Sequence, residues 1–158
     1  INTHCHIDHV LGNKFVYEKW NVKFYIHELE NKLLKEAENI SKIYGFENYK
    51  SSPTPDAFIN EDDIITLGTE KLNILFTPGH SPGHICLYYQ KNNILISGDV
   101  IFMNSIGRTD LPGGNYDTLI KSIKTKIFPL PKETKLLCGH GPSTNLDAEK
   151  RNNPFLKS

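Results

Sequence analysis

The sequence has few cysteines, no long hydrophobic run and no excess of either charge. Its three cysteines, Cys5, Cys86 and Cys138, do not suggest a disulfide framework, so we expect a reducing, cytoplasmic environment. No apolar run approaches the ~20 residues that span a bilayer, which predicts no membrane segment. Lysine plus arginine number 18 and aspartate plus glutamate number 18, so the chain lacks the basic excess of nucleic-acid-binding proteins.

The chain also lacks an initiator methionine, and its first metal-capable side chain is already at position 4. The total of 158 residues, 38% of them hydrophobic, suits one globular domain spanning residues 1–158. A metal-binding loop of the kind that opens the chain normally follows a buried strand. We therefore expect a fragment or processed product that lacks its leading strands.

Metal-capable side chains are concentrated in the opening segment Thr3-His4-Cys5-His6-Ile7-Asp8-His9. Histidine and aspartate supply the nitrogen and oxygen ligands that zinc and iron take. In an extended segment, His4, His6 and Asp8 would share one face. A turn or helix start near Asp8 would bring His9 to the same side, so that one loop serves two metals. The alternative is a polar loop that holds three histidines by chance.

Three further candidate ligands each follow directly on a predicted strand. They are His80 after residues 71–76, Asp99 after residues 94–97 and His140 after residues 136–138. A carboxylate beyond a buried strand is costly unless it is paired or bound to metal, so Asp99 suits a bridge between two cations. The alternative for Asp99 is a turn or helix cap. We expect His84 to support the site rather than to bind metal.

Helical spacing of apolar residues predicts helices over residues 10–20, 28–44 and 116–128. Between the strands and the last helix, residues 105–114 form a predicted long loop that carries Arg108. Its guanidinium could bind an anionic substrate group or pair with a neighbouring carboxylate, and the sequence leaves both open.

Seven side chains therefore form one candidate site with two metals. The division is His4, His6 and His80 for one metal, Asp8, His9 and His140 for the other, and Asp99 as the bridge. Each metal keeps an open position, which is typical of a catalytic site. Two divalent ions lower the pKa of a shared water towards ~7 and so provide a nucleophile at neutral pH. We expect zinc, with iron or manganese as alternatives.

The order of these motifs resembles the metallo-β-lactamase superfamily, and most closely its small glyoxalase II-like hydrolases. The motifs are His4-x-His6-x-Asp8-His9, Thr77-Pro78-Gly79-His80, Gly98-Asp99, Gly107-Arg108-Thr109-Asp110, Gly139-His140-Gly141-Pro142 and the Asn153-Pro154-Phe155 tail. The resemblance implies an α+β fold, a four-layer αββα sandwich with the metals at one edge of its two sheets. The strands that precede the first motif in this family are missing here.

The resemblance also implies hydrolysis of a small acyl thioester similar to S-lactoylglutathione. A hydroxide between the metals would attack the carbonyl, Asp8 would orient it, and Arg108 would hold a substrate carboxylate. Lactam hydrolysis ranks lower, because zinc β-lactamases usually carry cysteine or serine where Asp99 stands. One alternative is a sulfur oxidoreductase like the persulfide dioxygenases, with one iron at the first site. Another is a non-catalytic binding module on the same scaffold.

Overall fold

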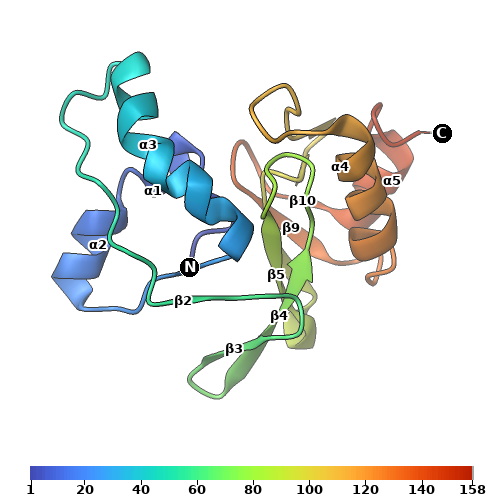
Figure 1. Cartoon of the computed structure of the whole chain (residues 1–158). Coiled ribbons are helices and arrows are strands. Elements are labelled where there is room, and N and C mark those ends of the chain that lie inside the picture. Colours follow the sequence, from blue (N-terminus) through green and yellow to red (C-terminus); the bar gives the residue numbers. More distant parts are fainter. Residues whose placement is uncertain (158) are drawn as a thin grey trace. The chain divides into compact units, whose positions relative to one another are not determined.

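The computed structural model describes residues 1–157, and the chain divides into two compact units, Ile1–Ile59 (unit 1) and Asn60–Ser158 (unit 2), which can be followed by colour in Figure 1. The prediction of one domain over residues 1–158 stays a prediction. Within the described residues, every helix is too short or too polar to cross a bilayer.

Unit 1 is mainly helical. Its elements are α1 (Ile7–Val10), α2 (Asn13–Trp20), β1 (Tyr25–Ile26), the 3-10 helix η1 (Glu28–Glu30), α3 (Asn31–Ile43) and β2 (Ala57–Phe58). The two short strands pair in parallel. The core of unit 1 packs Cys5, Ile7 and Val10 against Leu33 and Ala37 of α3. The predicted helix 28–44 is therefore present as η1 followed by α3. It buries the middle of its apolar stripe, Leu33 and Ala37, whereas Leu29 and Tyr44 at its ends are exposed.

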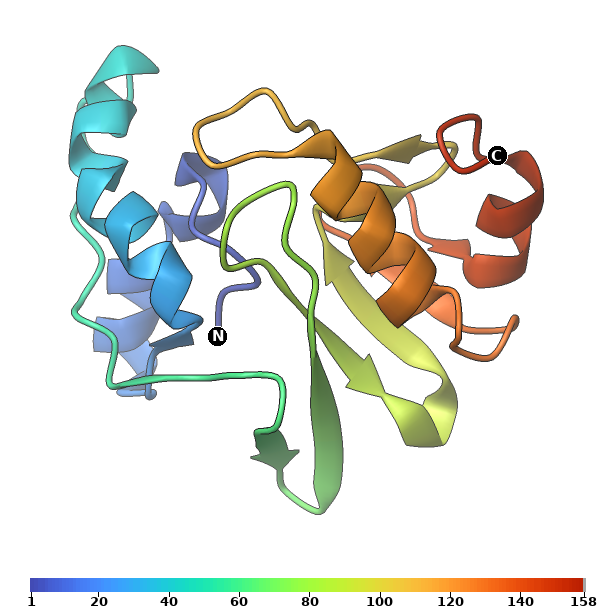
Figure 2. The ribbon, with the colours of Figure 1, turned by 45° about the vertical axis from the view of Figure 1, so that its right-hand side comes forward.

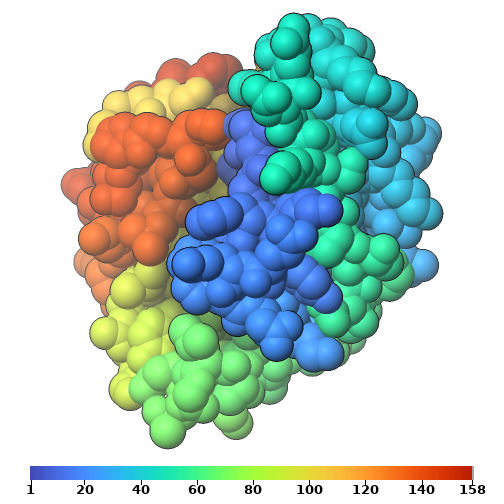
Figure 3. Space-filling model, turned by 90° about the vertical axis from the view of Figure 1, so that its left-hand side faces the viewer, coloured from blue at the N-terminus to red at the C-terminus, as the bar shows by residue number. Residues whose placement is uncertain are grey.

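Helix α2 differs from a typical amphipathic helix, because it contains no buried residue. Phe15 is 64% exposed and Trp20 is 59% exposed, and their rings meet edge to face at 5.7 Å. The space-filling view in Figure 3 shows the blue segment that includes α2 at the surface. The predicted helix 10–20 is thus two helices, with the break at Leu11 and Gly12.

Unit 2 contains a six-stranded sheet in the order β10-β9-β6-β5-β4-β3. Its elements are β3 (Ile64–Leu67), β4 (Glu70–Phe76), β5 (Ile85–Tyr89), η2 (Gln90–Asn92), β6 (Ile94–Gly98), β7 (Ile101–Phe102), β8 (Ser105–Ile106), α4 (Tyr116–Ser122), the π-helix η3 (Ile123–Ile127), β9 (Lys135–Cys138), β10 (Thr144–Asn145) and α5 (Leu146–Asn152). Strands β7 and β8 form a separate antiparallel hairpin.

The pairing within this sheet places three strand ends at one edge. β5 runs antiparallel to both β4 and β6, so β4 and β6 run in the same direction, and β9 pairs in parallel with β6. The carboxyl ends of β4, β6 and β9 therefore lie along the same edge of the sheet. Each of these strands is followed by one of the candidate ligands.

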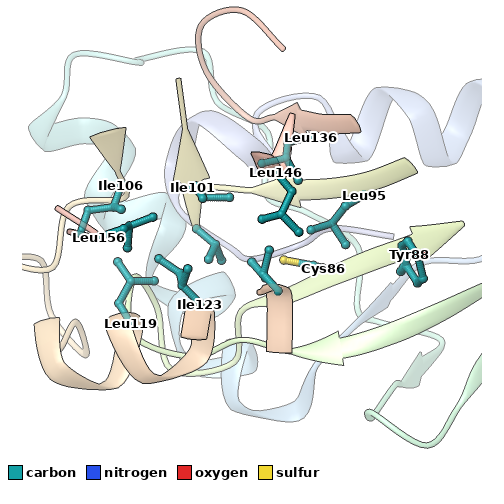
Figure 4. Close-up of a cluster of buried hydrophobic side chains, with 12 residues drawn as sticks. Cys86, Tyr88, Leu95, Ile101, Ile106, Leu119, Ile123, Leu136, Leu146 and Leu156 are labelled. Atoms are coloured by element: carbon teal, nitrogen blue, oxygen red, sulfur yellow. The ribbon is translucent and has the colours of Figure 1, made fainter. Parts of the chain in front are cut away.

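One face of the sheet packs against the helices of unit 2, as Figures 2 and 4 show. Tyr88, Leu95 and Leu136 are neighbours across β5, β6 and β9, which puts them on the same face. Leu119 of α4 and Leu146 of α5 pack into the same cluster and are fully buried. This core fixes the sheet, and with it the positions of the strand ends.

Candidate metal centre

In unit 1, the opening segment buries its apolar residues together with His4, while the other candidate ligands are partly or fully exposed. Cys5 and Ile7 are buried in the unit 1 core, whereas Asp8 is exposed. The backbone N–H of Cys5 donates to Oε2 of Glu30 at 2.7 Å, and Glu30 is only 1% exposed. A buried carboxylate on η1 thus fixes the main chain between His4 and His6.

Helix α1 supplies the turn that the sequence predicted near Asp8. The N–H of His9 donates to the carbonyl of His6 at 3.0 Å, which closes the first turn. As a result the ring of His4 lies 4.9 Å from that of His6 and 4.1 Å from that of His9, measured between centroids. Nε2 of His9 lies 3.5 Å from Oδ2 of Asp8. Unit 1 therefore gathers four of the seven predicted ligands.

In unit 2, His80 lies in a tight turn directly after β4, and α4 fixes that turn. The N–H of Asn115 donates to the carbonyl of Gly79 at 2.7 Å, and Oγ of Ser122 donates to the carbonyl of Pro78 at 2.7 Å. Gly79 has a φ of +132°, and a Cβ there would lie 2.3 Å from the backbone nitrogen of Leu119. Only glycine allows helix and turn to approach so closely.

The imidazole of His80 has a defined tautomer. Its Nδ1 lies 2.7 Å from the carbonyl oxygen of Arg108. Because a carbonyl only accepts hydrogen bonds, Nδ1 carries a proton, which leaves Nε2 as the ring nitrogen that can bind a metal. Nε2 lies 3.6 Å from Oδ2 of Asp99.

Asp99 lies between two histidines at the shared edge of the sheet. Its Oδ2 is 3.2 Å from Nε2 of His140, in addition to the 3.6 Å to His80. The N–H of Gly139 donates to the carbonyl of Gly98 at 2.8 Å, which joins the ends of β6 and β9. The parallel pairing of these strands is therefore the reason that Asp99 and His140 meet.

His84 supports Asp99, as the sequence predicted. The backbone N–H of Asp99 donates to Nε2 of His84 at 3.0 Å, so the proton of this ring is on Nδ1, 3.2 Å from Oγ1 of Thr77. Sγ of Cys86 lies 3.3 Å from Oγ1 of Thr77, and the Cys86 thiol donates to the carbonyl of Ser97. Burial raises the pKa of the Cys86 thiol to about 12, which keeps this donor protonated.

Arg108 contacts this group of ligands through its main chain, and its side chain pairs with Asp110. The guanidinium makes two hydrogen bonds to the Asp110 carboxylate, both 2.7 Å long, from Nε and Nη2. These bonds lower the pKa of Asp110 to about 2. The structure thus shows the pairing that the sequence left open, and the substrate-binding role of Arg108 stays a prediction.

His27 is a histidine outside both groups of ligands. It follows β1, is 9% exposed, and its Nδ1 accepts the N–H of Leu29 at 3.2 Å. Burial lowers its pKa and outweighs the opposing effect of Glu28. Its neutral ring acts as a cap for η1.

The donor atoms of unit 2 suit a carboxylate shared between two divalent metal ions. Oδ2 of Asp99 lies near one imidazole nitrogen from each of His80 and His140, and His80 donates its other ring N–H to a carbonyl, as metal-binding histidines usually do. His4, His6, Asp8 and His9 give unit 1 the same chemistry of nitrogen and oxygen ligands.

Comparison with known proteins places the chain in a family. Residues 1–140 match the model of the metallo-beta-lactamase superfamily. A probable metallo-hydrolase of Bacillus subtilis, YqgX, is 42% identical over 156 residues, which cover 98% of this chain and 73% of that protein. The hydroxyacylglutathione hydrolase GloC of Haemophilus influenzae is 37% identical over 158 residues, with coverage of 99% and 74%.

Solved structures agree with this assignment. The crystal structure of BLEG-1 B3 metallo-beta-lactamase superposes with a TM-score of 0.91 at 39% identity, covering 99% of this chain and 75% of that chain. TTHA1623, solved in a di-iron-bound form, gives a TM-score of 0.88 at 36% identity, with coverage of 97% and 74%. The chain belongs to the metallo-beta-lactamase superfamily and has its fold, as the sequence predicted, and this is a superfamily of metal-dependent hydrolases.

Apart from His84, the sequence did not reveal the residues that orient these ligands. The Arg108 contact uses a backbone carbonyl, which any residue carries, and Glu30 lies in an ordinary charged helical segment. Gly107 packs so closely that a Cβ would lie 1.9 Å from the Asp99 carbonyl oxygen. In the sequence Gly107 stands in the predicted loop 105–114, where glycine is common, so it carries only a weak signal.

Proposed function

We propose that the chain hydrolyses small acyl thioesters with two divalent metal ions. The observation that carries the metal site is the convergence of His80 and His140 on one carboxylate oxygen of Asp99 in unit 2. The thioester follows from the similarity to GloC, which is named a hydroxyacylglutathione hydrolase. The two ligand groups, one in each unit, would hold the ions together, because their motifs occur in the order of the superfamily.

The proposed division of ligands gives each ion three side chains and a shared bridge. His4, His6 and His80 would hold one ion, Asp8, His9 and His140 the other, and Asp99 both. The solved di-iron form of TTHA1623 supports a two-metal site and leaves zinc, iron and manganese open for this chain. When bound, two such ions activate water at neutral pH and polarise a carbonyl.

The chain's own residues would orient the reactants. Asp8 has a carboxylate with 46% of its side chain exposed, so it can accept a hydrogen bond from the attacking water. Asp99 is held through its backbone by His84, which keeps the bridge in place. A thiolate leaves readily because its conjugate acid has a pKa of about 8.5, so no strong general acid is required.

The test is hydrolysis of S-lactoylglutathione by the zinc-loaded chain, followed as released thiol, with and without chelator. His140→Gln should reduce the rate by more than the ~10–100-fold typical of changes around a metal ligand. His27→Asn is the matched control, because it removes a buried histidine outside both groups and retains a capping oxygen. Equal rates for both variants, or turnover unaffected by chelator, would contradict the proposal.

Substitution of Arg108 tests whether the chain recognises a carboxylate on its substrate. Arg108→Ala removes the guanidinium and leaves the carbonyl that accepts from His80, so the metal site should persist. We expect KM for a thioester that carries a carboxylate to rise roughly tenfold, which corresponds to about 1.4 kcal/mol. KM for a neutral thioester should not change, and an equal rise for both substrates would exclude this role.

A second candidate is hydrolysis of a β-lactam, favoured by the 39% identity to BLEG-1 B3 metallo-beta-lactamase. Parallel assays with S-lactoylglutathione and a chromogenic cephalosporin separate thioester hydrolysis from β-lactam hydrolysis. We expect a higher kcat/KM for the thioester. Element analysis of the same sample addresses the oxidoreductase alternative, because one iron per chain would favour a persulfide dioxygenase and two metals would favour hydrolysis.

A further inference from the structure

The hairpin formed by β7 and β8, residues 101–106, lies between Asp99 and Arg108 in the chain and contacts His140; we call it the ligand hairpin. It begins two residues after Asp99. It ends just before Gly107, and the next carbonyl, that of Arg108, accepts the Nδ1 proton of His80. The ring of Phe102 meets the ring of His140 edge to face, 6.1 Å between centroids.

The C-terminal helix α5 holds this hairpin through a buried carboxylate. Glu149 is 1% exposed, and its Oε2 accepts the backbone N–H of Asn104 at 2.9 Å and Nδ2 of Asn153 at 2.9 Å. Asn153 is fully buried, and the same Nδ2 donates to the carbonyl of Ser105 at 2.9 Å. Glu149 and Asn153 therefore bind the turn of the ligand hairpin from both its donor and its acceptor side.

Glu149 also holds the segment that follows His140. Its Oε1 accepts from Oγ1 of Thr144 at 2.7 Å, four residues beyond His140. One side chain thus ties the hairpin that lies between Asp99 and Arg108 to the loop that carries His140. Three neutral donors surround this carboxylate, an arrangement that offsets its desolvation only if all three bonds form.

We propose that Glu149 is a positioning residue for the metal ligands of unit 2, setting His140 relative to Asp99 and His80. This inference rests on the proposed metal site. Glutamine at this position removes the negative charge that strengthens all three hydrogen bonds, and its amide N–H₂ can bond only to the Thr144 hydroxyl, in the reversed direction, so the links to Thr144 and to the hairpin are weakened.

The experiment compares Glu149→Gln with Asp147→Asn, which removes the same charge from an exposed position of the same helix. Zinc affinity is measured by competition with a chelator, at a temperature where both variants are folded. We expect Glu149→Gln to raise the dissociation constant for zinc roughly 10–100-fold, and Asp147→Asn to leave it unchanged. A lower melting temperature with unchanged zinc affinity would show a merely structural role and overturn the proposal.

A metal-free measurement separates this proposal from the proposed function. The ¹⁵N signals of the His80 and His140 rings should move in Glu149→Gln and not in Asp147→Asn. A wild-type chain that binds no zinc would overturn the proposed function, and the ring signals would still decide the role of Glu149. Unmoved signals would overturn that role even if the wild type binds zinc.

Thr144→Val is the milder variant in case Glu149→Gln does not fold. It removes a single hydrogen bond to Oε1 of Glu149 and leaves the bonds to Asn104 and Asn153. We expect the His140 signal to move while the His80 signal stays. An unmoved His140 signal in Thr144→Val would overturn the proposal, as unmoved ring signals in Glu149→Gln would.

Discussion

Individual backbone groups orient the candidate ligands as much as side chains do. The carbonyl of Arg108 fixes the tautomer of His80, and the N–H of Asp99 donates to His84. Neither group changes with the identity of its residue, so substitutions there act through shape and conformation. Gly107, which lies against the Asp99 carbonyl, is the position where shape matters most.

Gly107→Ala should destabilise the chain and disturb Asp99. Its Cβ would lie 1.9 Å from the Asp99 carbonyl oxygen and 3.1 Å from Nδ1 of His80, so the backbone must shift. Overpacking of this kind costs about 1–3 kcal/mol, measured as the change in free energy of unfolding in denaturant.

The control for this variant is Gly12→Ala in unit 1, where a Cβ meets nothing within 4 Å and φ is −90°. That change should be neutral or stabilise by about 0.4–1 kcal/mol, because alanine restricts the unfolded chain. If both variants are equally stable, the close contact at Gly107 does not constrain the site.

At the scale of secondary structure, elements with a clear period or a clear stop were predictable. The strands before His80, Asp99 and His140 are apolar runs that end in glycine or proline, and the structure places them as predicted. Elements of two residues, such as β7 and β8, carry no period, and the residues from 105 on were therefore expected to be a loop.

The helix predicted over 116–128 shows a second limit. It is α-helical only to Ser122 and continues as the π-helix η3, closed by the N–H of Phe128 donating to the carbonyl of Ile123 at 2.9 Å. Both forms bury Leu119 and Ile123 on one side, so the apolar spacing alone does not distinguish them. The three candidate ligands of unit 2 were found because they follow strands. Glu149 was not found, because a glutamate in a helix is ordinary.

The start of α4 gives a prediction at this scale. Oδ1 of Asn115 accepts the N–H of Thr118 at 2.8 Å, and its own N–H donates to Gly79 beside His80. Asn115→Ala should cost about 1 kcal/mol in free energy of unfolding, because the helix loses its cap.

Asn115→Asp is the matched variant, since its carboxylate retains the capping oxygen; it should unfold like the wild type. Calorimetry or denaturant unfolding of both variants checks the difference. A loss of equal size in the two would mean that the cap is not the cause.

At the scale of the whole molecule, the proposed function requires ligands from both units. Zinc should then slow amide exchange in unit 1, at the Cys5 N–H held by Glu30, and in unit 2, at the Gly139 N–H held by Gly98. A free zinc concentration of about 100 times the dissociation constant would stabilise the folded chain by about 2.7 kcal/mol.

His140→Gln, a change in unit 2 alone, should remove much of the zinc-dependent protection of Cys5 in unit 1. Hydrogen exchange followed by NMR reads both amides in one sample, and His27→Asn serves as the control. Full protection of Cys5 in His140→Gln would show that unit 1 binds zinc without the unit 2 ligands and would contradict a shared centre.

The parallel register of β6 and β9 limits where this chain tolerates insertions. Adding or deleting one residue within β9 would slide His140 by about 3.3 Å along β6 and turn its neighbours to the opposite face of the sheet. The segment from Thr109 to Gly114 lies outside the paired strands and bears no such constraint. Changes of length accumulated over generations should therefore concentrate in that segment, while the spacing between strand ends is inherited unchanged.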